Sequence, residues 1–245
     1  MSNIPDAINL YLKKYGFRAF KPKAVLFDMD GVLYDSMPNH AIAWHESMKM
    51  FGINMTASDA YLTEGARGID TIRHMVEKQQ GRIISEIEAQ KMYDEKSRVF
   101  HSMNEAPLMP GIKDLMTQIT ECGIGIGVVT GSGQRPLIKR LLHDFSDFLD
   151  ENHITTAYDV SKGKPAPDPY LKGLSKFCGL NPWEAVVIEN APLGVEAGVA
   201  AKIFTIAVNT GPLPDACLKE KGADLLFSSI TDLADSGFFL AHDLL

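Results

Sequence analysis

Short apolar runs alternate with amphipathic segments along most of this chain. The runs are rich in Val, Ile, Leu and Phe and are typical of buried parallel strands; they lie at 23–27, 124–129, 185–188, 203–208 and 225–227. Helical patterns follow at 112–121, 134–143, 169–178, 193–201 and 214–221. This alternation predicts right-handed βαβ units and an α/β fold with a doubly wound, Rossmann-like parallel sheet.

The interval 38–106 breaks the alternation, because it contains helical patterns and no convincing strand. Ser36 and Pro38 favour the start of a helix, on which Trp44, Met48 and Phe51 would share one face. Further helices are expected near 69–79 and 84–101. The interval is therefore predicted to be an α-helical cap domain, with hinges near 36–38 and 105–110 and with the α/β core formed by residues 21–37 and 107–245.

Residues 1–20 are predicted to form a short helix or arm that ends near Tyr15–Gly16 and packs without taking part in chemistry. Asp6 and the lack of a long apolar stretch argue against a secretory signal. No run approaches the roughly 20 apolar residues of a membrane span. The three cysteines have no CxxC spacing and are predicted to be reduced thiols of a cytoplasmic protein; they are Cys122, Cys178 and Cys217.

The charge balance is acidic, with 24 Lys and Arg against 31 Asp and Glu and a net charge of −7 over 245 residues. This excess argues against a broad contact with nucleic acid or with an anionic membrane surface. No protein partner is evident. An anionic ligand would have to be held by a few placed groups or by a metal.

Three familiar motifs are absent. Thr130 stands where a dinucleotide fingerprint beginning at Gly125 requires its third glycine. There is no GxxxxGK[ST] phosphate loop. The segment His45–Lys49 lacks the second histidine of a zinc HExxH motif.

Two aspartates, Asp28 and Asp30, stand directly after the first apolar run and just before Gly31. In open α/β sheets, ligands bind outside the carboxyl ends of the strands. Two neighbouring carboxylates repel each other and attract a hard cation that prefers oxygen ligands. The sequence therefore predicts a Mg²⁺ site at this strand end.

The segment from Asp28 to Ser36, read as DxDGxLxDS, resembles the first motif of the haloacid dehalogenase superfamily. Similar motifs follow in order: Val128-Val-Thr130-Gly-Ser-Gly, Gly163-Lys164-Pro-Ala-Pro-Asp168 and Val187-Ile-Glu189-Asn190. The separations of 34 residues from Thr130 to Lys164 and 25 from Lys164 to Glu189 each correspond to about one βα unit. Asp28 and Thr130 are 102 residues apart, and the surplus of roughly 70 matches an inserted cap.

The resemblance implies a role for each motif residue. Asp28 would attack phosphorus and form an aspartyl-phosphate. Asp30 would protonate the leaving oxygen and then take a proton from water or from an acceptor hydroxyl. The implied Mg²⁺ ligands are Asp28, the backbone carbonyl of Asp30, Asn190 and, directly or through water, Glu189. The groups implied to hold the phosphoryl oxygens are Thr130, Lys164, the Gly31 N–H, Gly131 and Ser132.

The cap is expected to select the substrate. His40 resembles the cap histidine that faces the catalytic acid in the β-phosphoglucomutase subgroup, although a simply packed histidine is the alternative. The segment 61–72 resembles the substrate-specificity loop of that subgroup, in which Arg67 would meet a second phosphate or stay on the surface. Glu64 in this loop resembles the glutamate of inorganic pyrophosphatase members, and an acid in the closed site would favour a small substrate.

Two features depart from the pattern of the relatives. Asn190 stands where many of them carry Asp, so we expect a weaker Mg²⁺ site with the chemistry retained. The loop Thr130-Gly-Ser-Gly-Gln134 lacks the Ser-Lys-Asn character of phosphoglucomutases.

Together these features favour a Mg²⁺-dependent phosphohydrolase acting on a small phosphorylated substrate, either pyrophosphate or a small phosphate ester. The alternative with related chemistry is a β-phosphoglucomutase that interconverts β-glucose 1-phosphate and glucose 6-phosphate. The alternative of another class is a non-catalytic regulatory protein on the same fold, against which the intact motif residues argue.

Overall fold

The core of the protein is a parallel sheet with the strand order β3-β2-β1-β4-β5-β6. The computed structural model describes residues 4–240. The strands are β1 (Ala24–Phe27), β2 (Gly125–Val129), β3 (Ile154–Thr155), β4 (Ala185–Glu189), β5 (Phe204–Val208) and β6 (Leu225–Phe227). This is the order of a doubly wound, Rossmann-like sheet, so the predicted fold class is confirmed. Strand β1 is central, and its carboxyl end lies between those of β2 and β4.

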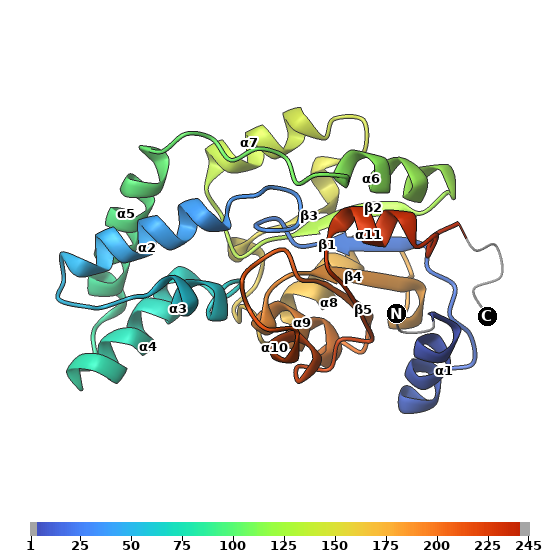
Figure 1. Cartoon of the computed structure of the whole chain (residues 1–245), viewed down its shortest axis with the longest axis horizontal. Helices are drawn as coiled ribbons and strands as arrows, with labels where there is room; N and C mark the ends of the chain where they lie inside the picture. Colours follow the sequence, from blue (N-terminus) through green and yellow to red (C-terminus); the bar gives the residue numbers. More distant parts are fainter. Residues whose placement is uncertain (1–3, 241–245) are drawn as a thin grey trace.

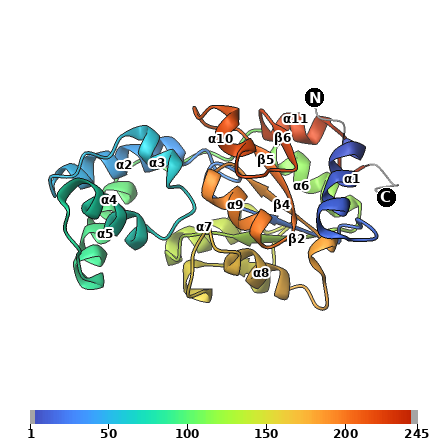
Figure 2. The same cartoon turned by 90° about the horizontal axis from the view of Figure 1, so that it is seen from below.

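Helices cover both faces of the sheet (Figures 1 and 2). One face carries α6 (Ile112–Glu121), α7 (Arg135–Asp144) and α11 (Ile230–Asp235). The other face carries α8 (Asp168–Ser175), α9 (Pro192–Ala200) and α10 (Asp215–Lys219). Short 3-10 helices lie at Glu151–His153, Ala157–Asp159 and Pro182–Glu184.

Strand β1 is buried on both faces, which explains its unbroken apolar sequence. Val25 and Phe27 pack into the cluster under α6 and α11, whereas Ala24 and Leu26 pack into the cluster under α8 and α9. The chain can then become polar only where the strand ends, at Asp28. The first aspartate of the motif is thereby fixed at the edge of the sheet.

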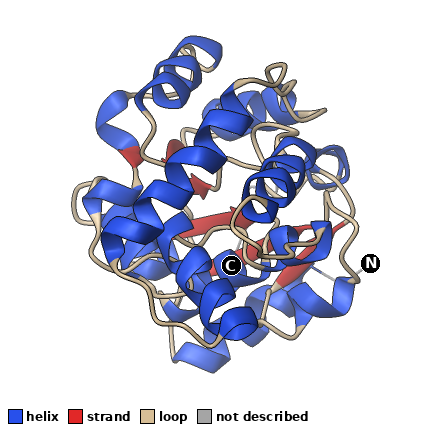
Figure 3. Ribbon diagram, turned by 90° about the vertical axis from the view of Figure 1, so that its left-hand side faces the viewer, coloured by secondary structure: helices blue, strands red, loops and turns tan. Residues whose placement is uncertain are grey.

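Four helices lie between β1 and α6, at one end of the molecule (Figure 1), and this end faces the viewer in Figure 3. They are α2 (Met37–Lys49), α3 (Ala57–Leu62), α4 (Gly68–Gln80) and α5 (Glu86–His101). They enclose a hydrophobic cluster of their own, which includes Trp44 and Met48. We therefore propose that they form a cap domain. The prediction that Phe51 shares their buried face is wrong, because α2 ends at Lys49 and Phe51 is 39% exposed.

The predicted N-terminal helix is α1 (Ile4–Tyr15), which lies at the end of the molecule opposite α2–α5 (Figure 1); residues 1–3 of this predicted arm lie outside the described part. Tyr11 of α1 is fully buried and its hydroxyl donates to the backbone oxygen of Lys202 at 2.8 Å. The helix therefore packs beside the start of β5. Within residues 4–240, no helix combines the length and the apolar character needed to cross a membrane.

The Asp224 carboxylate at the start of β6 predicts a pH-dependent stability. It accepts a hydrogen bond from the Thr205 N–H at 2.8 Å, and burial raises the pKa of Asp224 to about 6. Because this pKa exceeds the value of about 4 in an unfolded chain, the folded state holds the proton more tightly. The stability that protonation supplies is complete below about pH 4 and is lost as the pH rises through about 6.

Asp224→Asn, which cannot ionise and keeps an acceptor, should therefore gain stability relative to the wild type between about pH 4 and pH 7, by at most about 3 kcal/mol. Urea unfolding midpoints across that range measure the difference. The exposed Asp235→Asn serves as the control. A difference that stays constant with pH would contradict this account of Asp224.

Candidate active site

Five polar side chains meet at the carboxyl ends of neighbouring strands. Asp28 follows β1, Thr130 follows β2, and Glu189 and Asn190 stand at the end of β4. Lys164 enters from the loop before α8. All five are buried, although each is polar or charged. The chain therefore gathers here groups that are costly to bury unless they are paired or bind a ligand.

Lys164 is the centre of the buried charge. Its Nζ lies 2.5 Å from Asp28 Oδ1 and 2.6 Å from Glu189 Oε1, and it also donates to the Val129 carbonyl at 3.2 Å. Burial works against its charged form, but the two carboxylates outweigh burial and raise the pKa of Lys164. Burial, opposed in part by Lys164, raises the pKa of Asp28 to about 7. Two carboxylates therefore share one ammonium, and the site is short of positive charge.

Glu189 has both oxygens engaged by the protein. Oε1 accepts from Lys164 and from the Tyr170 hydroxyl at 2.8 Å, and Oε2 accepts the N–H groups of Asn190 and Ala191 at 3.0 and 3.1 Å. These contacts favour a role for Glu189 in holding Lys164. Its predicted role as a metal ligand, directly or through water, stays a prediction.

Gly31 has a structural role that differs from the predicted one. Its φ is +83°, and a Cβ there would lie 2.0 Å from Asn190 Nδ2, so no side chain fits. Its N–H donates to the Tyr34 carbonyl at 2.8 Å and closes a tight turn. A bond from this N–H to a phosphoryl oxygen would have to replace the bond to Tyr34, and this role stays a prediction.

Two buried oxygens at this site have no hydrogen-bond partner among the described residues: Asp28 Oδ2 and Asn190 Oδ1. Unpaired buried oxygens are rare, and a carboxylate with an amide oxygen suits Mg²⁺. Within residues 4–240, no three His, Cys, Asp or Glu side chains gather as a metal cluster. Mg²⁺ does not need such a cluster, however, because it also binds amide and backbone oxygens and commonly keeps several waters. The residues present thus fit a Mg²⁺ ion held by Asp28, Asn190 and a backbone oxygen.

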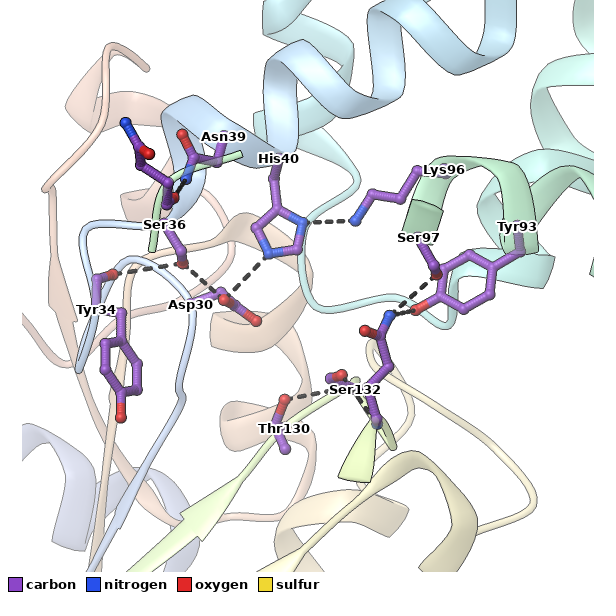
Figure 4. Close-up of polar contacts among 12 residues, drawn as sticks. Asp30, Tyr34, Ser36, Asn39, His40, Tyr93, Lys96, Ser97, Thr130 and Ser132 are labelled. Carbon is purple, nitrogen blue, oxygen red and sulfur yellow. Dashed lines mark hydrogen bonds and ion pairs between the residues drawn. The ribbon is translucent and has the colours of Figure 1, made fainter. Parts of the chain in front are cut away.

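Asp30 is held by a chain of buried polar groups that reaches into the cap (Figure 4). Its Oδ1 accepts from the Ser36 hydroxyl at 2.6 Å and lies 3.1 Å from His40 Nε2. His40 Nδ1 lies 2.7 Å from Lys96 Nζ on α5. The predicted approach of His40 to Asp30 is confirmed. Ser36, expected to start α2, directs its hydroxyl to Asp30 instead of capping the helix.

The protonation of this chain follows from its contacts. A Lys ammonium has only donors, so His40 Nδ1 must accept and Nε2–H must donate to Asp30. Burial and Lys96 lower the pKa of His40, which favours this neutral imidazole. Burial lowers the pKa of Lys96 to about 8. Burial would raise the pKa of Asp30, but His40, Ser36 and Lys96 outweigh it and lower that pKa to about 2. The chain is therefore an Asp⁻–His–Lys⁺ arrangement.

The loop after β2 lies against the cap loop at 63–67. Thr130 Oγ1 accepts the Ser132 N–H at 3.0 Å, and a Cβ on Gly131 would lie 2.9 Å from the Gly65 carbonyl. Gln134 Nε2 donates to Ser97 Oγ at 3.0 Å and lies 3.5 Å from the Tyr93 hydroxyl, both on α5 (Figure 4). The structure therefore represents a closed arrangement of cap and core.

A small cavity of about 40 Å³ lies between cap and core. One buried water needs about 10–15 Å³ of cavity volume, so this cavity has room for roughly three waters. Glu64 lines it, together with Asp30, His40, Lys96, Ser132 and Gln134. Burial, Asp30 and Asp28 raise the pKa of Glu64 well above its ordinary value. Glu64 therefore faces the site, as the small-substrate hypothesis requires.

Arg67 lies at the edge of this site and not in the cavity that Glu64 lines. Its guanidinium bonds the Asp70 carboxylate at 2.7 and 3.1 Å. Its side-chain stem packs on Gly163, where a Cβ would lie 2.7 Å from the Arg67 Cγ. A contact with a second phosphate would have to displace Asp70, and this role stays a prediction.

Two residues of the site were not expected from the sequence. Lys96 lies on the same face of α5 as the buried Ala89 and Met92. A charged residue on this apolar face was the sequence signal that could have identified it. Gln134 Oε1 is buried without a partner among the described residues, and Gln134 lines the cavity. No sequence pattern marks that oxygen, because its burial depends on the cap.

Fold and site together define a class of protein, namely a doubly wound α/β enzyme with a buried Asp–Lys–Glu centre beneath a group of helices. A sequence model of the haloacid dehalogenase-like hydrolase family matches residues 25–208. The chain therefore belongs to the haloacid dehalogenase-like hydrolase family.

Relatives within this family agree in fold and differ in activity. Hexitol phosphatase A of Escherichia coli is 33% identical over 86% of this chain and 93% of its own. Beta-phosphoglucomutase of Bacillus subtilis is 29% identical over 86% of this chain and 91% of its own. A solved structure from Bacteroides vulgatus, described as a candidate beta-phosphoglucomutase, is 47% identical, covers 98% of both chains and has a TM-score of 0.93.

Proposed function

We propose that this protein is a Mg²⁺-dependent phosphohydrolase that acts on a small phosphorylated substrate through an aspartyl-phosphate on Asp28. The observation that carries the proposal is the state of the Asp28 carboxylate. One oxygen is fixed by Lys164, and the other is buried with no partner in the part of the chain from 4 to 240, as is the amide oxygen of Asn190. A bound Mg²⁺ would supply positive charge to a site that is short of it, and would neutralise developing charge on the phosphoryl group.

Each residue has a role that its contacts support. An Asp28 oxygen forms the bond to phosphorus as the bond to the leaving oxygen breaks, and Lys164 stabilises charge on the phosphoryl oxygens. Because Asp30 is ionised in this structure, it must first take up a proton from solvent. It then gives that proton to the leaving oxygen and takes one from the water that attacks the aspartyl-phosphate. His40 and Ser36 hold Asp30 Oδ1, and the other carboxylate oxygen points away from both (Figure 4).

Hydrolysis of a small substrate is favoured by the size and lining of the closed cavity. A cavity of about 40 Å³ would have to enlarge greatly to enclose a hexose phosphate. Glu64 lines that space, and the loop from Thr130 to Gln134 lacks the Ser-Lys-Asn character of phosphoglucomutases. Gln134 presents an amide to the same cavity. Since the Ser97 and Tyr93 hydroxyls can each donate or accept, that amide can present oxygen or nitrogen to a leaving group.

Release of inorganic phosphate from a substrate panel tests this proposal. Metal-stripped protein is assayed with and without Mg²⁺ on pyrophosphate, small phosphate esters and β-glucose 1-phosphate. We expect release only with Mg²⁺, and fastest from pyrophosphate. Absence of phosphate release from every compound would overturn the proposal.

Glu64→Ala should broaden the activity towards sugar phosphates, because it removes an acid from the closed cavity and adds room. The kcat/KM ratio of β-glucose 1-phosphate to pyrophosphate should rise by at least about tenfold, equivalent to about 1.4 kcal/mol. Glu64→Gln, which keeps the volume and removes the charge, separates size from charge. If neither variant changes the ratio, Glu64 does not select the substrate.

A second candidate function is that of a β-phosphoglucomutase. The 47% identity and the TM-score of 0.93 to the Bacteroides vulgatus structure favour it. In this case the aspartyl-phosphate would pass to a sugar hydroxyl instead of water. The cap would have to close over a sugar, with Glu64 and Gln134 displaced.

A further inference from the structure

Two chain segments join the cap helices to the core, and they run side by side. The first covers residues 30–36 and leads from β1 into α2, whereas the second covers residues 102–110 and leads from α5 to α6. The Asp35 N–H donates to the Pro107 carbonyl at 3.0 Å, and the Met109 N–H donates to the Leu33 carbonyl at 2.9 Å. Any rotation of the cap must therefore bend or shear this paired hinge.

One side chain of the core, that of Arg140 on α7, contacts both hinge segments. Its guanidinium carbon lies 4.5 Å from the centre of the Tyr34 ring in the first segment. Its second terminal nitrogen donates to the Ala106 carbonyl in the second segment at 2.5 Å. Its Nε donates to the Asp144 carboxylate at 3.2 Å, and the same oxygen accepts the Tyr34 hydroxyl at 3.0 Å. Arg140 Nε also lies 3.6 Å from the carboxylate of Glu105 in the second segment, so several contacts tie the hinge to α7.

The first hinge segment also shapes the turn that carries Asp30. The Tyr34 carbonyl accepts the Gly31 N–H at 2.8 Å, and the Tyr34 N–H donates to the Met29 carbonyl at 3.2 Å. Ser36, two residues after Tyr34, holds the Asp30 carboxylate. A group that fixes Tyr34 therefore fixes both Asp30 and its hydrogen-bond donor relative to the core.

We propose that Arg140 is a positioning residue. Its contacts with both hinge segments fix the position of the cap relative to the core, and with it the orientation of Asp30. Arginine suits this role because its planar guanidinium group can donate hydrogen bonds in two directions while the face of the group stacks on an aromatic ring. A lysine ammonium is a point charge and cannot make all these contacts together. The kinetic part of this inference rests on the proposed phosphohydrolase activity, whereas the hinge part does not.

The space beside the hinge supports a mechanical role. A cavity of about 150 Å³ adjoins Arg140 and is lined by residues of both hinge segments and of α7. None of the buried side-chain atoms left without a partner among the described residues lines this cavity. The cavity also reaches Asp30 and Ser36, and it gives Phe100 and Met103 space into which they could shift if the cap rotated.

Hydrogen exchange and kinetics of Arg140→Met, measured on the full chain, test the proposal. We expect the amides of Asp35 and Met109 to exchange at least about tenfold faster than in the wild type, while those of β1, β2 and β4 stay unchanged. We expect kcat for pyrophosphate to fall by about 10- to 100-fold and KM to change by less than about threefold, since orientation is lost and not binding. Arg140→Lys should be intermediate.

The control is Arg82→Met, an exposed arginine of the cap that pairs with Glu88 and is not in the hinge. It should leave exchange and kinetics unchanged. Unchanged exchange at Asp35 and Met109 in Arg140→Met would overturn the proposal, and so would faster exchange spread equally over the sheet, which signals only a lower global stability. If the wild type releases phosphate from no compound of the substrate panel, the proposed function fails, but the exchange result still decides the role of Arg140.

Discussion

Asp28→Asn should lower kcat for pyrophosphate by at least about 10³-fold, the scale seen when a group that forms the covalent intermediate is removed. An amide of the same shape keeps the packing at the end of β1 but is not a nucleophile. Lys164 keeps one carboxylate partner in this variant, because Glu189 lies 2.6 Å from its Nζ. The fold should therefore survive, and the loss should be one of chemistry.

Single-turnover phosphate release and intact-mass detection of a phosphorylated protein measure this effect. The wild type should show a transient phosphoryl adduct and Asp28→Asn should show none. Asp35→Asn provides the matched control, because Asp35 belongs to the same motif but is exposed. Retention of a tenth or more of wild-type turnover by Asp28→Asn would rule out Asp28 as the nucleophile.

Lys164→Met should lose both activity and stability. The variant leaves the carboxylates of Asp28 and Glu189 buried without their shared counter-ion, and removing one partner of a buried ion pair costs about 3–5 kcal/mol. The phosphoryl oxygens lose a positive charge as well, which should lower kcat by about 10²-fold or more. Urea unfolding and steady-state kinetics measure the two effects.

A double variant separates the two roles of Lys164. Lys164→Met with Glu189→Gln removes one of the stranded charges and should recover part of the stability without recovering activity. Lys162→Met, an exposed lysine two residues away, should match the wild type in both measurements. An unfolding free energy of Lys164→Met within about 1 kcal/mol of the wild type would contradict the buried-charge account.

The features that could be predicted from the sequence are those set by short stretches of chain. Apolar runs ending in Asp28, Thr130 and Glu189 mark strand ends, and parallel strands bring their carboxyl ends to one edge. Three short elements, however, were not predicted. Strand β3 has two residues, and α3 and α11 have six each, so none carries a readable period.

The features that could not be predicted depend on contacts between distant segments. Lys96 and His40 are 56 positions apart, and their contact exists only because α2 packs on α5. The engagement of Glu189 Oε1 by Lys164 and Tyr170 also follows from tertiary packing. A motif names residues that meet, but it does not say which of their atoms remain free.

The most direct test of hydrolysis through Asp28 is phosphorus NMR of the protein with Mg²⁺, pyrophosphate, β-glucose 1-phosphate and a trace of glucose 1,6-bisphosphate in one tube. Both candidate reactions are then visible together. We predict that free phosphate grows as pyrophosphate disappears and that the sugar phosphate signal persists. Accumulation of glucose 6-phosphate without free phosphate would contradict the account and would identify a mutase.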